Sequence, residues 1–286
     1  MNYEDTKSPR AAKTAPLCLR AFVVERICGR FMEEREGSTP CQYSIVFATV
    51  SHRLLITFHI LHFNPMKTCL LLPAYNESQT IGRIIQEANL FVGRVVVIDD
   101  GSLDKTADIA DVNGVVVLRH SRNRGKGMAL RTGFDYALKN EYELIVTMDS
   151  DGQHDPFDLP RFFDYFRWRH PDILIGERLE ERSAMPLHRR LNNSLVSAVG
   201  TALAGQTVPD FQSGYRLIQA KVLKAVCLET ERYETESEIL IQAGQRGFRI
   251  ESLPIRAIYG NEVSNVKPLR EMWLFSRLLV KSLRTL

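Results

Sequence analysis

Short apolar runs alternate with helix-like stretches from Met66 onward, and this rhythm constrains the fold more than any other feature of the chain. The apolar runs, each of a length suited to one strand, are Lys67–Leu72, Val95–Ile98, Val115–Leu118, Leu144–Met148 and Ile173–Ile175. The stretches between them that have the pattern of helices are Thr80–Leu90, Lys105–Ala110, Lys126–Leu138 and Pro160–Phe166. Continuous apolar runs are typical of strands buried on both faces, and strands that alternate with helices form parallel sheets. The sequence therefore predicts an α/β fold, a mostly parallel sheet flanked by helices, with its ligand site at the carboxyl ends of the strands.

Residues 1–65 show no such rhythm, and charges are scattered through them. Met66 leads directly into the first apolar run, as the start of a folded protein would. We therefore expect residues 1–65 to be an N-terminal extension that is poorly ordered or that precedes the natural translation start. The candidate membrane span within it, Tyr43–Phe63, contains Arg53 near its centre. Because an arginine at mid-bilayer costs about 2.5–3.5 kcal/mol, we predict no transmembrane helix there.

Composition narrows the functional classes. The net charge of the 286 residues is +3, so bulk positive charge gives no reason to expect nucleic-acid binding. The five cysteines are odd in number and form no C-x-x-C pair, which indicates neither a disulfide framework nor a zinc site. Cys69 and Cys227 lie among apolar residues and are predicted to be buried, inert thiols, which fits a reducing cytosol.

Asp149 and Asp151 are the strongest candidates for chemistry. They stand two residues apart directly after the apolar run Leu144–Met148, where a parallel sheet opens its ligand site. Mg²⁺ and Mn²⁺ prefer oxygen ligands and are satisfied by one or two carboxylates together with substrate phosphates. We therefore predict that both aspartates hold a divalent cation, with an acidic surface turn as the alternative.

Two other functions of a D-x-D segment fit the sequence less well. In an EF-hand counted from Asp149, position 6 would be glycine and position 12 glutamate, but here they are His154 and Pro160. A phosphatase that forms an aspartyl phosphate also places D-x-D-G after a strand, with its first aspartate as the nucleophile. That motif is expected on the first strand and continues with Thr or Val, whereas Gln153 follows about the fourth strand here.

Polar segments also follow the first two apolar runs. Leu72–Glu77 and Val97–Ser102 contain carboxylates that suit a ribose or a base, and turn formation or helix capping is the alternative explanation. The chain contains neither G-x-x-x-x-G-K-[ST] nor G-x-G-x-x-G, so no phosphate loop of these types is present. Asn123–Gly127 is predicted to be the start of a helix rather than a phosphate contact.

Seven short segments occur in an order that is itself informative: Pro73–Glu77, Asp99–Ser102, Gly125–Leu130, Asp149–His154, Gly176–Arg178, Ser213–Arg216 and Glu234–Glu236. Over Lys67 to about Lys267 the chain thereby resembles family 2 glycosyltransferases of the GT-A fold. The resemblance is closest to those that transfer mannose or glucose to dolichyl or other polyprenyl phosphates. It implies a GT-A fold for residues 66–267 and an activity that uses a nucleotide-diphospho-sugar.

The resemblance also implies roles for individual residues. The nucleotide would be lined by Pro73, Tyr75, Glu77, Ile98 and Asp100. The metal, Mg²⁺ or Mn²⁺, and the diphosphate would contact Asp149, Asp151 and Gln153, and the donor would also contact Arg178. Arg189 and Arg190 would face the acceptor phosphate. Asp210 and Glu236 are candidates for a catalytic base, with loop fixing or helix capping as the alternative. A basic residue that the family often carries late in the chain is replaced by Asn265, with Lys267 nearby.

The implied reaction is an inverting transfer from a UDP- or GDP-sugar to a polyprenyl phosphate. A phosphate acceptor is mostly ionised at neutral pH and needs no protein base, whereas a sugar hydroxyl would need one. Transfer to a glycan hydroxyl in cell-surface polysaccharide synthesis and non-catalytic binding of a nucleotide-sugar are the alternatives.

Residues 268–286 have the pattern of a basic amphipathic helix, which can lie on an anionic membrane or pack on the domain. We therefore expect a cytoplasmic protein that binds peripherally to the cytoplasmic face of a membrane. The need for a membrane partner protein stays open.

Overall fold

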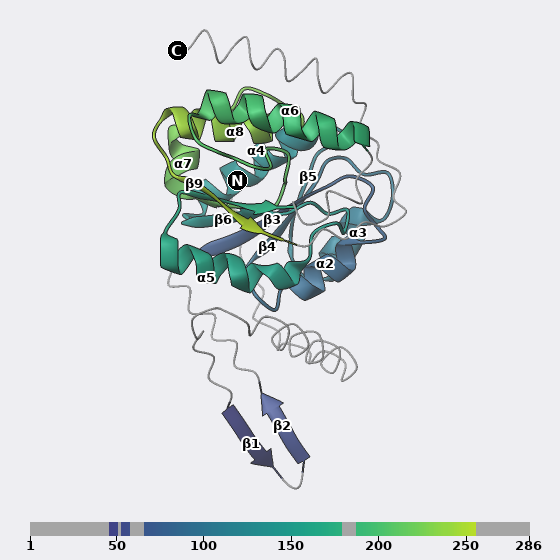
Figure 1. Ribbon diagram of the computed structural model, residues 1–286. Coiled ribbons are helices and arrows are strands. Elements are labelled where there is room, and N and C mark those ends of the chain that lie inside the picture. Colours follow the sequence, from purple (N-terminus) through teal and green to yellow (C-terminus); the bar gives the residue numbers. More distant parts are fainter. Residues whose placement is uncertain (1–45, 51–52, 58–65, 179–186, 256–286) are drawn as a thin grey trace. The chain divides into compact units, whose positions relative to one another are not determined.

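The computed structural model describes residues 46–50, 53–57, 66–178 and 187–255, with residues 46–50, 53–57 and 187–195 described by their backbone alone (Figure 1). The chain forms two units, Met1–Ile60 and Leu61–Leu286. In the first unit, strands β1 (Val46–Val50) and β2 (Arg53–Thr57) pair antiparallel, in a stretch where the sequence predicts no regular element. The expected helix over residues 268–286 lies outside the described residues.

A seven-stranded sheet organises the second unit, in the order β5-β4-β3-β6-β8-β7-β9. Its strands are β3 (Thr68–Ala74), β4 (Val95–Asp99), β5 (Val116–Arg119), β6 (Leu144–Thr147), β7 (Ile173–Glu177), β8 (Arg216–Gln219) and β9 (Ile250–Pro254). All neighbouring pairs are parallel except those of β8, which runs antiparallel to both β6 and β7. The predicted, mostly parallel sheet is thus confirmed.

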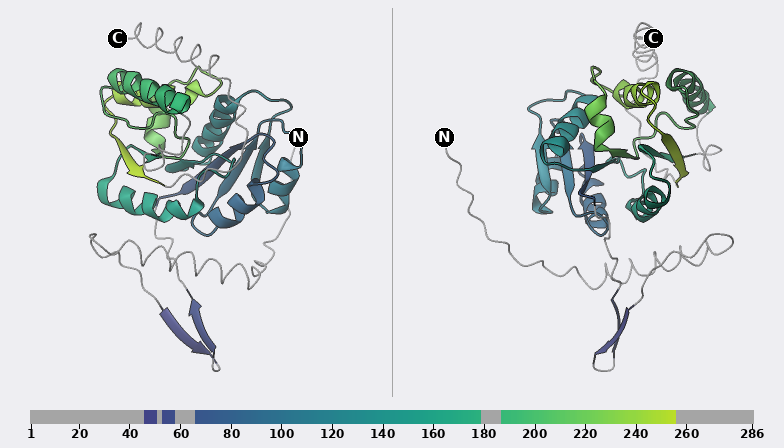
Figure 2. Two further views of the ribbon diagram at one scale, coloured as in Figure 1. Left: turned by 45° about the vertical axis from the view of Figure 1, so that its right-hand side comes forward. Right: turned by 90° about the vertical axis from the view of Figure 1, so that its left-hand side faces the viewer.

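Helices cover both faces of this sheet. They are α2 (Ile81–Ala88), α3 (Thr106–Val112), α4 (Lys126–Lys139), α5 (Leu159–Arg169), α6 (Leu187–Ala204), α7 (Ala220–Ala225) and α8 (Glu234–Gln245), and a short 3₁₀ turn, Pro156–Asp158, precedes α5. Figures 1 and 2 show α2, α3 and α5 on one face and α4, α6, α7 and α8 on the other. The flanking helices explain why every residue of β4 and β6 is buried.

Apolar spacing explains how the helices attach. Helix α2 buries residues at intervals of three and four, namely Ile81, Ile84, Ile85 and Ala88, which places them on one face. Each fully buried isoleucine contributes about 1.5–3 kcal/mol relative to exposure. Helix α4 begins at Lys126, which confirms the helix start predicted at Asn123–Gly127.

The two cysteines in the described part of this unit differ in environment. Cys69 is buried in β3, and burial raises the pKa of its thiol to about 12, as expected for an inert thiol. The prediction that Cys227 is also buried is wrong, because Cys227 is exposed. It follows α7, and its backbone pairs with the Gln242 side chain instead of packing into the core.

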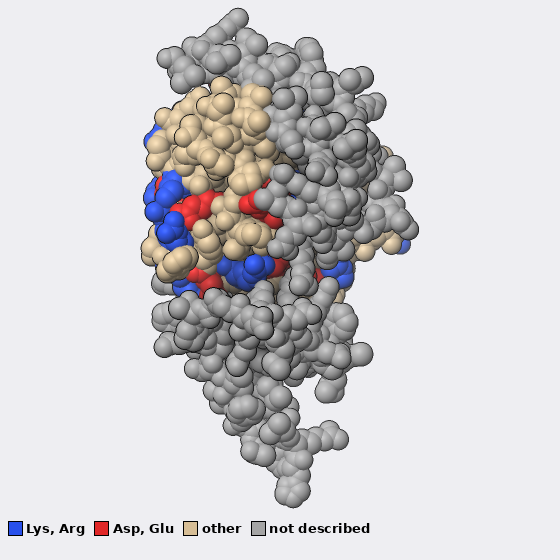
Figure 3. Space-filling model, in the orientation of Figure 1, with Lys and Arg blue, Asp and Glu red and all other residues tan. Residues whose placement is uncertain are grey.

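The described part of the face in Figure 3 carries basic and acidic side chains next to one another below a largely uncharged region. Among the described residues, Arg169 and Arg249 form ion pairs with Glu251, and surface pairs of this kind contribute little to stability. No helix within the described ranges is long and apolar enough to cross a membrane.

Candidate active site

The loops that follow β3, β4 and β6 meet at the carboxyl ends of these strands. The backbone N–H of Asp100, after β4, donates to the carbonyl of Ala74 in β3 (2.8 Å). The hydroxyl of Ser150, after β6, donates to the carbonyl of Pro73 (2.9 Å). The polar segments that the sequence assigned to one site are therefore joined by hydrogen bonds at one edge of the sheet.

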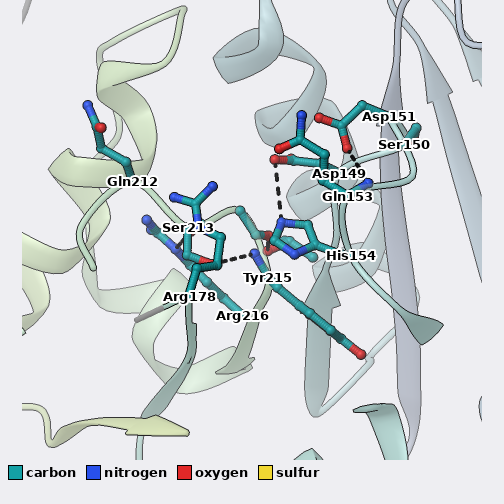
Figure 4. Close-up of polar contacts among 12 residues, drawn as sticks. Asp149, Ser150, Asp151, Gln153, His154, Arg178, Gln212, Ser213, Tyr215 and Arg216 are labelled. Atoms are coloured by element: carbon teal, nitrogen blue, oxygen red, sulfur yellow. Dashed lines mark hydrogen bonds and ion pairs between the residues drawn. The ribbon is translucent and has the colours of Figure 1, made fainter. Parts of the chain in front are cut away.

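Asp149 stands at the centre of a partly buried cluster of charges. Its Oδ1 lies 2.6 Å from Nζ of Lys126, the first residue of α4, and its Oδ2 lies 3.7 Å from Nε2 of His154. The same lysine nitrogen lies 3.0 Å from Oε2 of Glu236, in the first turn of α8. Figure 4 shows the imidazole of His154 directed at the Asp149 carboxylate. The cluster therefore joins α4, the loop after β6 and α8.

The pKa values of this cluster follow from burial and neighbouring charge. Burial opposes ionisation of Asp149, but the Lys126 ammonium and the contact with His154 outweigh it and hold the pKa of this carboxyl well below its usual range. Burial also opposes the charge on Lys126, but Asp149 and Glu236 outweigh it and raise the pKa of the lysine. For Asp151, burial and the charge of Asp149 raise the pKa. Lys126 and Asp149 are thus a stable ion pair at neutral pH.

Asp151 and Gln153 complete the donor set predicted for a metal. Oδ1 of Asp151 accepts a hydrogen bond from the backbone N–H of Gln153 (2.9 Å), which places the two residues side by side (Figure 4). Within the described ranges, no group of three or more His, Cys, Asp or Glu side chains is arranged to hold a metal ion. Two carboxylates and an amide oxygen fit a Mg²⁺ or Mn²⁺ ion whose coordination is completed by phosphate oxygens, since these ions retain open positions for a substrate.

Gly214, in the loop before β8, allows another segment to approach Asp149 closely. A Cβ atom at Gly214 would lie 2.4 Å from Oδ1 and 2.6 Å from Oδ2 of Asp149. The hydroxyl of Thr147 donates to the Gly214 carbonyl (2.9 Å) and holds this loop against the end of β6. Glycine is therefore required here because any side chain would displace the carboxylate.

Arg178 and Asp210, both predicted from the sequence, are partners of each other. The guanidinium binds the carboxylate through two bonds, Nε to Oδ2 (2.8 Å) and Nη2 to Oδ1 (3.1 Å). Burial opposes ionisation of Asp210, but the charge of Arg178 outweighs it and lowers the pKa of the carboxyl. This pair links the end of β7 to the loop that precedes β8.

Arg216, in β8, is fully buried and holds that same loop in place. Its guanidinium donates to the backbone carbonyls of Phe211 (2.9 Å), Ser213 (2.8 Å) and Glu236 (2.5 Å). Figure 4 shows Arg216 and Arg178 on the same side of the site. A single buried cation therefore fixes both the loop that carries Asp210 and the start of α8.

The predicted nucleotide residues occupy different environments. Tyr75 is 40% exposed, and the backbone N–H of Glu77 donates to the Thr106 hydroxyl (2.8 Å). Pro73 of β3 pairs in register with Ile98 of β4, and the Ile98 side chain is fully buried in the core. Of this group, Tyr75 presents the most exposed side chain.

Both carboxylate oxygens of Asp100 already have hydrogen-bond partners within the protein. Its Oδ1 accepts from the backbone N–H of Arg124 (2.9 Å) and lies 2.7 Å from Nδ1 of His120, while its Oδ2 accepts from the backbone N–H of Gly125 (2.8 Å). Nε2 of His120 in turn lies 2.9 Å from the hydroxyl of Thr132. Asp100 therefore fixes the loop that leads into α4.

Arg189 and Arg190 lie in the first turn of α6, and their side chains are outside the described residues. Four residues for which the sequence analysis predicted no role contact the predicted residues directly: Lys126, His154, Gly214 and Arg216. All four belong to the seven short segments whose order along the chain resembles that of the family. That membership was the signal by which the sequence could have identified them.

Known proteins are similar to this chain in sequence. The sequence pattern described as glycosyl transferase family 2 matches residues 69–227. The UDP-N-acetylglucosamine–dolichyl-phosphate N-acetylglucosaminyltransferase of Methanococcus voltae is 32% identical, over 66% of this chain and 85% of that protein. The undecaprenyl-phosphate mannosyltransferase of Micrococcus luteus is 30% identical, over 66% and 83% of the two chains.

A solved structure has the same fold. Glucosyl-3-phosphoglycerate synthase from Mycobacterium tuberculosis, in complex with Mn²⁺, UDP and phosphoglyceric acid, aligns with a TM-score of 0.59 and 20% identity, over 77% of this chain and 78% of that one. This likeness confirms the predicted GT-A fold. Because the family match spans more than half of the 286 residues, the chain belongs to the family 2 glycosyltransferases.

Proposed function

We propose that this glycosyltransferase moves a sugar, with inversion and with the help of Mg²⁺ or Mn²⁺, from a UDP- or GDP-sugar to a polyprenyl phosphate. Relatives at 28–32% identity are named for transfer to dolichyl or undecaprenyl phosphate or for polyprenol monophosphomannose synthesis, or as glycosyltransferases. Their names support the acceptor class. The site geometry supports the same acceptor class independently, because both carboxylates that could act as a base are paired with cations.

The observation that carries the proposal is the engagement of both candidate bases. Asp210 is held by two bonds from Arg178, and Glu236 is held by Lys126. An Asp carboxylate whose pKa is lowered by an arginine accepts a proton poorly. A sugar hydroxyl needs a base to remove its proton, whereas a phosphate with a second pKa near 6 is mostly ionised at neutral pH. The arrangement therefore favours an acceptor that arrives already ionised.

The donor would bind at the carboxyl ends of β3, β4 and β6. We assign Asp149, Asp151 and Gln153 to the metal, which when bound neutralises charge on the diphosphate leaving group. We assign Pro73, Tyr75, Glu77, Ile98 and Asp100 to the nucleotide side, with Tyr75 as the exposed contact and Asp100 acting through the loop that it holds. Arg178, restrained by Asp210, would orient the donor.

The acceptor phosphate would be held by Arg189 and Arg190 at the start of α6. Arginine binds phosphate through its planar fork, and each charge-assisted bond of this kind contributes about 1.5–3 kcal/mol. Because polyprenyl lipids reside in membranes and nucleotide-sugars in the cytoplasm, the proposal places the enzyme at the cytoplasmic face of a membrane. Residues 268–286 would then help it to bind there.

The test is a transfer assay with a panel of UDP- and GDP-sugars, in Mg²⁺ or Mn²⁺, with short-chain polyprenyl phosphates as acceptors. The matching polyprenols without phosphate and soluble glycans are the comparison acceptors. We expect transfer only to the phosphates. Transfer to a glycan hydroxyl alone would refute the acceptor, and nucleotide-sugar binding without turnover on any acceptor would indicate a non-catalytic binder.

The arginine assignment has its own variant. The double substitution Arg189→Ala and Arg190→Ala should raise KM for the polyprenyl phosphate at least about 100-fold, since two charge-assisted bonds are lost, and should leave nucleotide affinity nearly unchanged. Lys221→Ala and Lys224→Ala on α7 are the matched control. Helix α7 begins beside Glu143, which directly precedes β6 and so lies at the opposite end of that strand from Asp149. An equal effect of both double variants would remove Arg189 and Arg190 from the acceptor site.

A further inference from the structure

Lys126 has no part in donor or acceptor binding as proposed above, yet it lies between two carboxylates of the charge cluster. Its Nζ lies between Oδ1 of Asp149 (2.6 Å) and Oε2 of Glu236 (3.0 Å), and its side chain is only 17% exposed. The ring of Tyr233 lies 5.8 Å from the same nitrogen. A lysine that is enclosed in this way is held in one position rather than moving freely in solvent.

The backbone around Lys126 is fixed as firmly as its side chain. The N–H of Gly125 donates to Oδ2 of Asp100 (2.8 Å), and the N–H of Met128 donates to the carbonyl of Glu231 (2.9 Å). A Cβ atom at Gly127 would lie 2.0 Å from the hydroxyl oxygen of Thr235, so the first turn of α4 packs directly against the start of α8. The backbone from which the Lys126 side chain extends is therefore held by contacts between both helices.

Asp149 and Asp151 have different contacts within the protein. Asp149 has Lys126 on one oxygen, His154 near the other, and Gly214 against the carboxylate. Asp151 accepts one bond, from the backbone of Gln153. A cation that enters the nucleotide-free site finds Asp149 already paired with an ammonium group, and it must compete with that group for the carboxylate.

We propose that Lys126 is a positioning residue that competes with the divalent cation for Asp149, so that the cation binds the nucleotide-free enzyme weakly and binds tightly only together with the nucleotide. This inference rests on the proposed donor and metal. The diphosphate supplies oxygen ligands that Asp149 withholds while it is paired with Lys126. Removal of Lys126 leaves two carboxylates, Asp149 and Glu236, without their shared ammonium and frees Oδ1 of Asp149 as a ligand.

The experiment measures Mn²⁺ binding to the full chain by electron paramagnetic resonance, without nucleotide and with saturating UDP or GDP. Lys126→Met should bind Mn²⁺ about tenfold more tightly than wild type when no nucleotide is present, because a bound cation no longer competes with a charge 2.6 Å from the ligand atom. The gain from nucleotide should shrink by a similar factor. Lys126→Arg, which keeps the cation, should bind Mn²⁺ as wild type does.

Two controls separate this role from a general effect of charge. Lys139→Met removes a cation from the exposed last turn of the same helix and should leave Mn²⁺ affinity unchanged. Adding Asp149→Asn to Lys126→Met should abolish the gain, because the freed ligand atom is then gone. A gain that persists in this double variant would show that Lys126 acts through bulk charge and would overturn the proposal.

Other outcomes also decide the question. Unchanged or weaker Mn²⁺ binding in a cooperatively melting Lys126→Met protein would overturn the proposal, and Lys126→Gln provides the same comparison if the methionine variant does not fold. Equal Mn²⁺ affinity of wild type with and without a bound nucleotide would overturn it without any variant. If neither UDP nor GDP binds, the proposed donor is refuted, while the nucleotide-free titration still reports on Lys126.

Discussion

Gly214→Ala tests the geometry of the site with a single methyl group. The added Cβ would lie 2.4 Å from Oδ1, 2.6 Å from Oδ2 and 2.7 Å from Cγ of Asp149, whereas ordinary contacts of this kind begin at 3.4 Å. One of the two groups must therefore move by about 1 Å. The loop cannot retreat freely, because the Gly214 carbonyl accepts from Thr147 and Arg216 anchors the neighbouring carbonyl of Ser213.

Asp149 must then yield, and its movement breaks the 2.6 Å contact with Lys126. A misplacement of about 1 Å at a catalytic group reduces turnover about 100-fold, and overpacking of this size costs about 1–3 kcal/mol of folding free energy. We expect kcat/KM of Gly214→Ala to fall about 100-fold and Tm to fall by a few degrees. The assays are sugar transfer from the best donor and thermal unfolding of the metal-free protein.

Gly93→Ala is the matched control, since nothing lies within 4 Å of a Cβ at that position. Its kcat/KM and Tm should equal those of wild type. The reasoning fails if Gly214→Ala keeps wild-type kcat/KM, because Asp149 would then tolerate displacement. It also fails if the Gly93 variant loses as much activity, because the effect would then reflect any added methyl group.

Two further predictions concern the metal and pH. Binding of UDP or GDP, measured by calorimetry, should require Mg²⁺ or Mn²⁺. Asp151→Asn should retain the fold, bind nucleotide without this metal requirement and lose most turnover. Equal nucleotide affinity of wild type in EDTA would show that the site does not use a metal. The pKa of Asp210 is lowered in the folded state, so its pairing with Arg178 stabilises the fold at neutral pH and this stabilisation is lost on acidification. Between about pH 6 and about pH 3, the free energy of unfolding should therefore fall more for wild type than for Asp210→Asn, and parallel curves would show that the pair does not affect stability.

The strands that the sequence predicted, β3 to β7, each contain a run of three or more apolar residues. The helices that connect them follow from apolar spacing. β8 was not predicted, because it begins with the fully buried Arg216, whose charge is accommodated by the carbonyls of Phe211 and Ser213 in the preceding loop and of Glu236 in α8. β9, with the sequence Ile-Glu-Ser-Leu-Pro, is a partly buried edge strand without a clear period. Both β8 and β9 form strands because they hydrogen-bond to neighbouring strands of the sheet, which a local sequence pattern does not reveal.

The site was predictable where local pattern coincides with position in the fold. Asp149 and Asp151 could be placed because a D-x-D segment after a buried strand lies at the ligand edge of a parallel sheet. Lys126 could not be placed, because a lysine at a helix start is usually solvated, and only the packing of Gly127 against Thr235 brings it to Asp149 and Glu236. The pairing of Arg178 with Asp210 likewise depends on two loops meeting.

The residues assigned separately to nucleotide and metal are connected through the start of α4. Asp100 holds the backbone of Arg124 and Gly125, and His120 braces Asp100 against Thr132 in the same helix. The next residue, Lys126, reaches Asp149. A change at Asp100 would therefore shift the helix turn from which Lys126 extends. In the function proposed above, this continuous set of contacts is the route by which Asp100, whose oxygens already have partners in the protein, would affect donor binding.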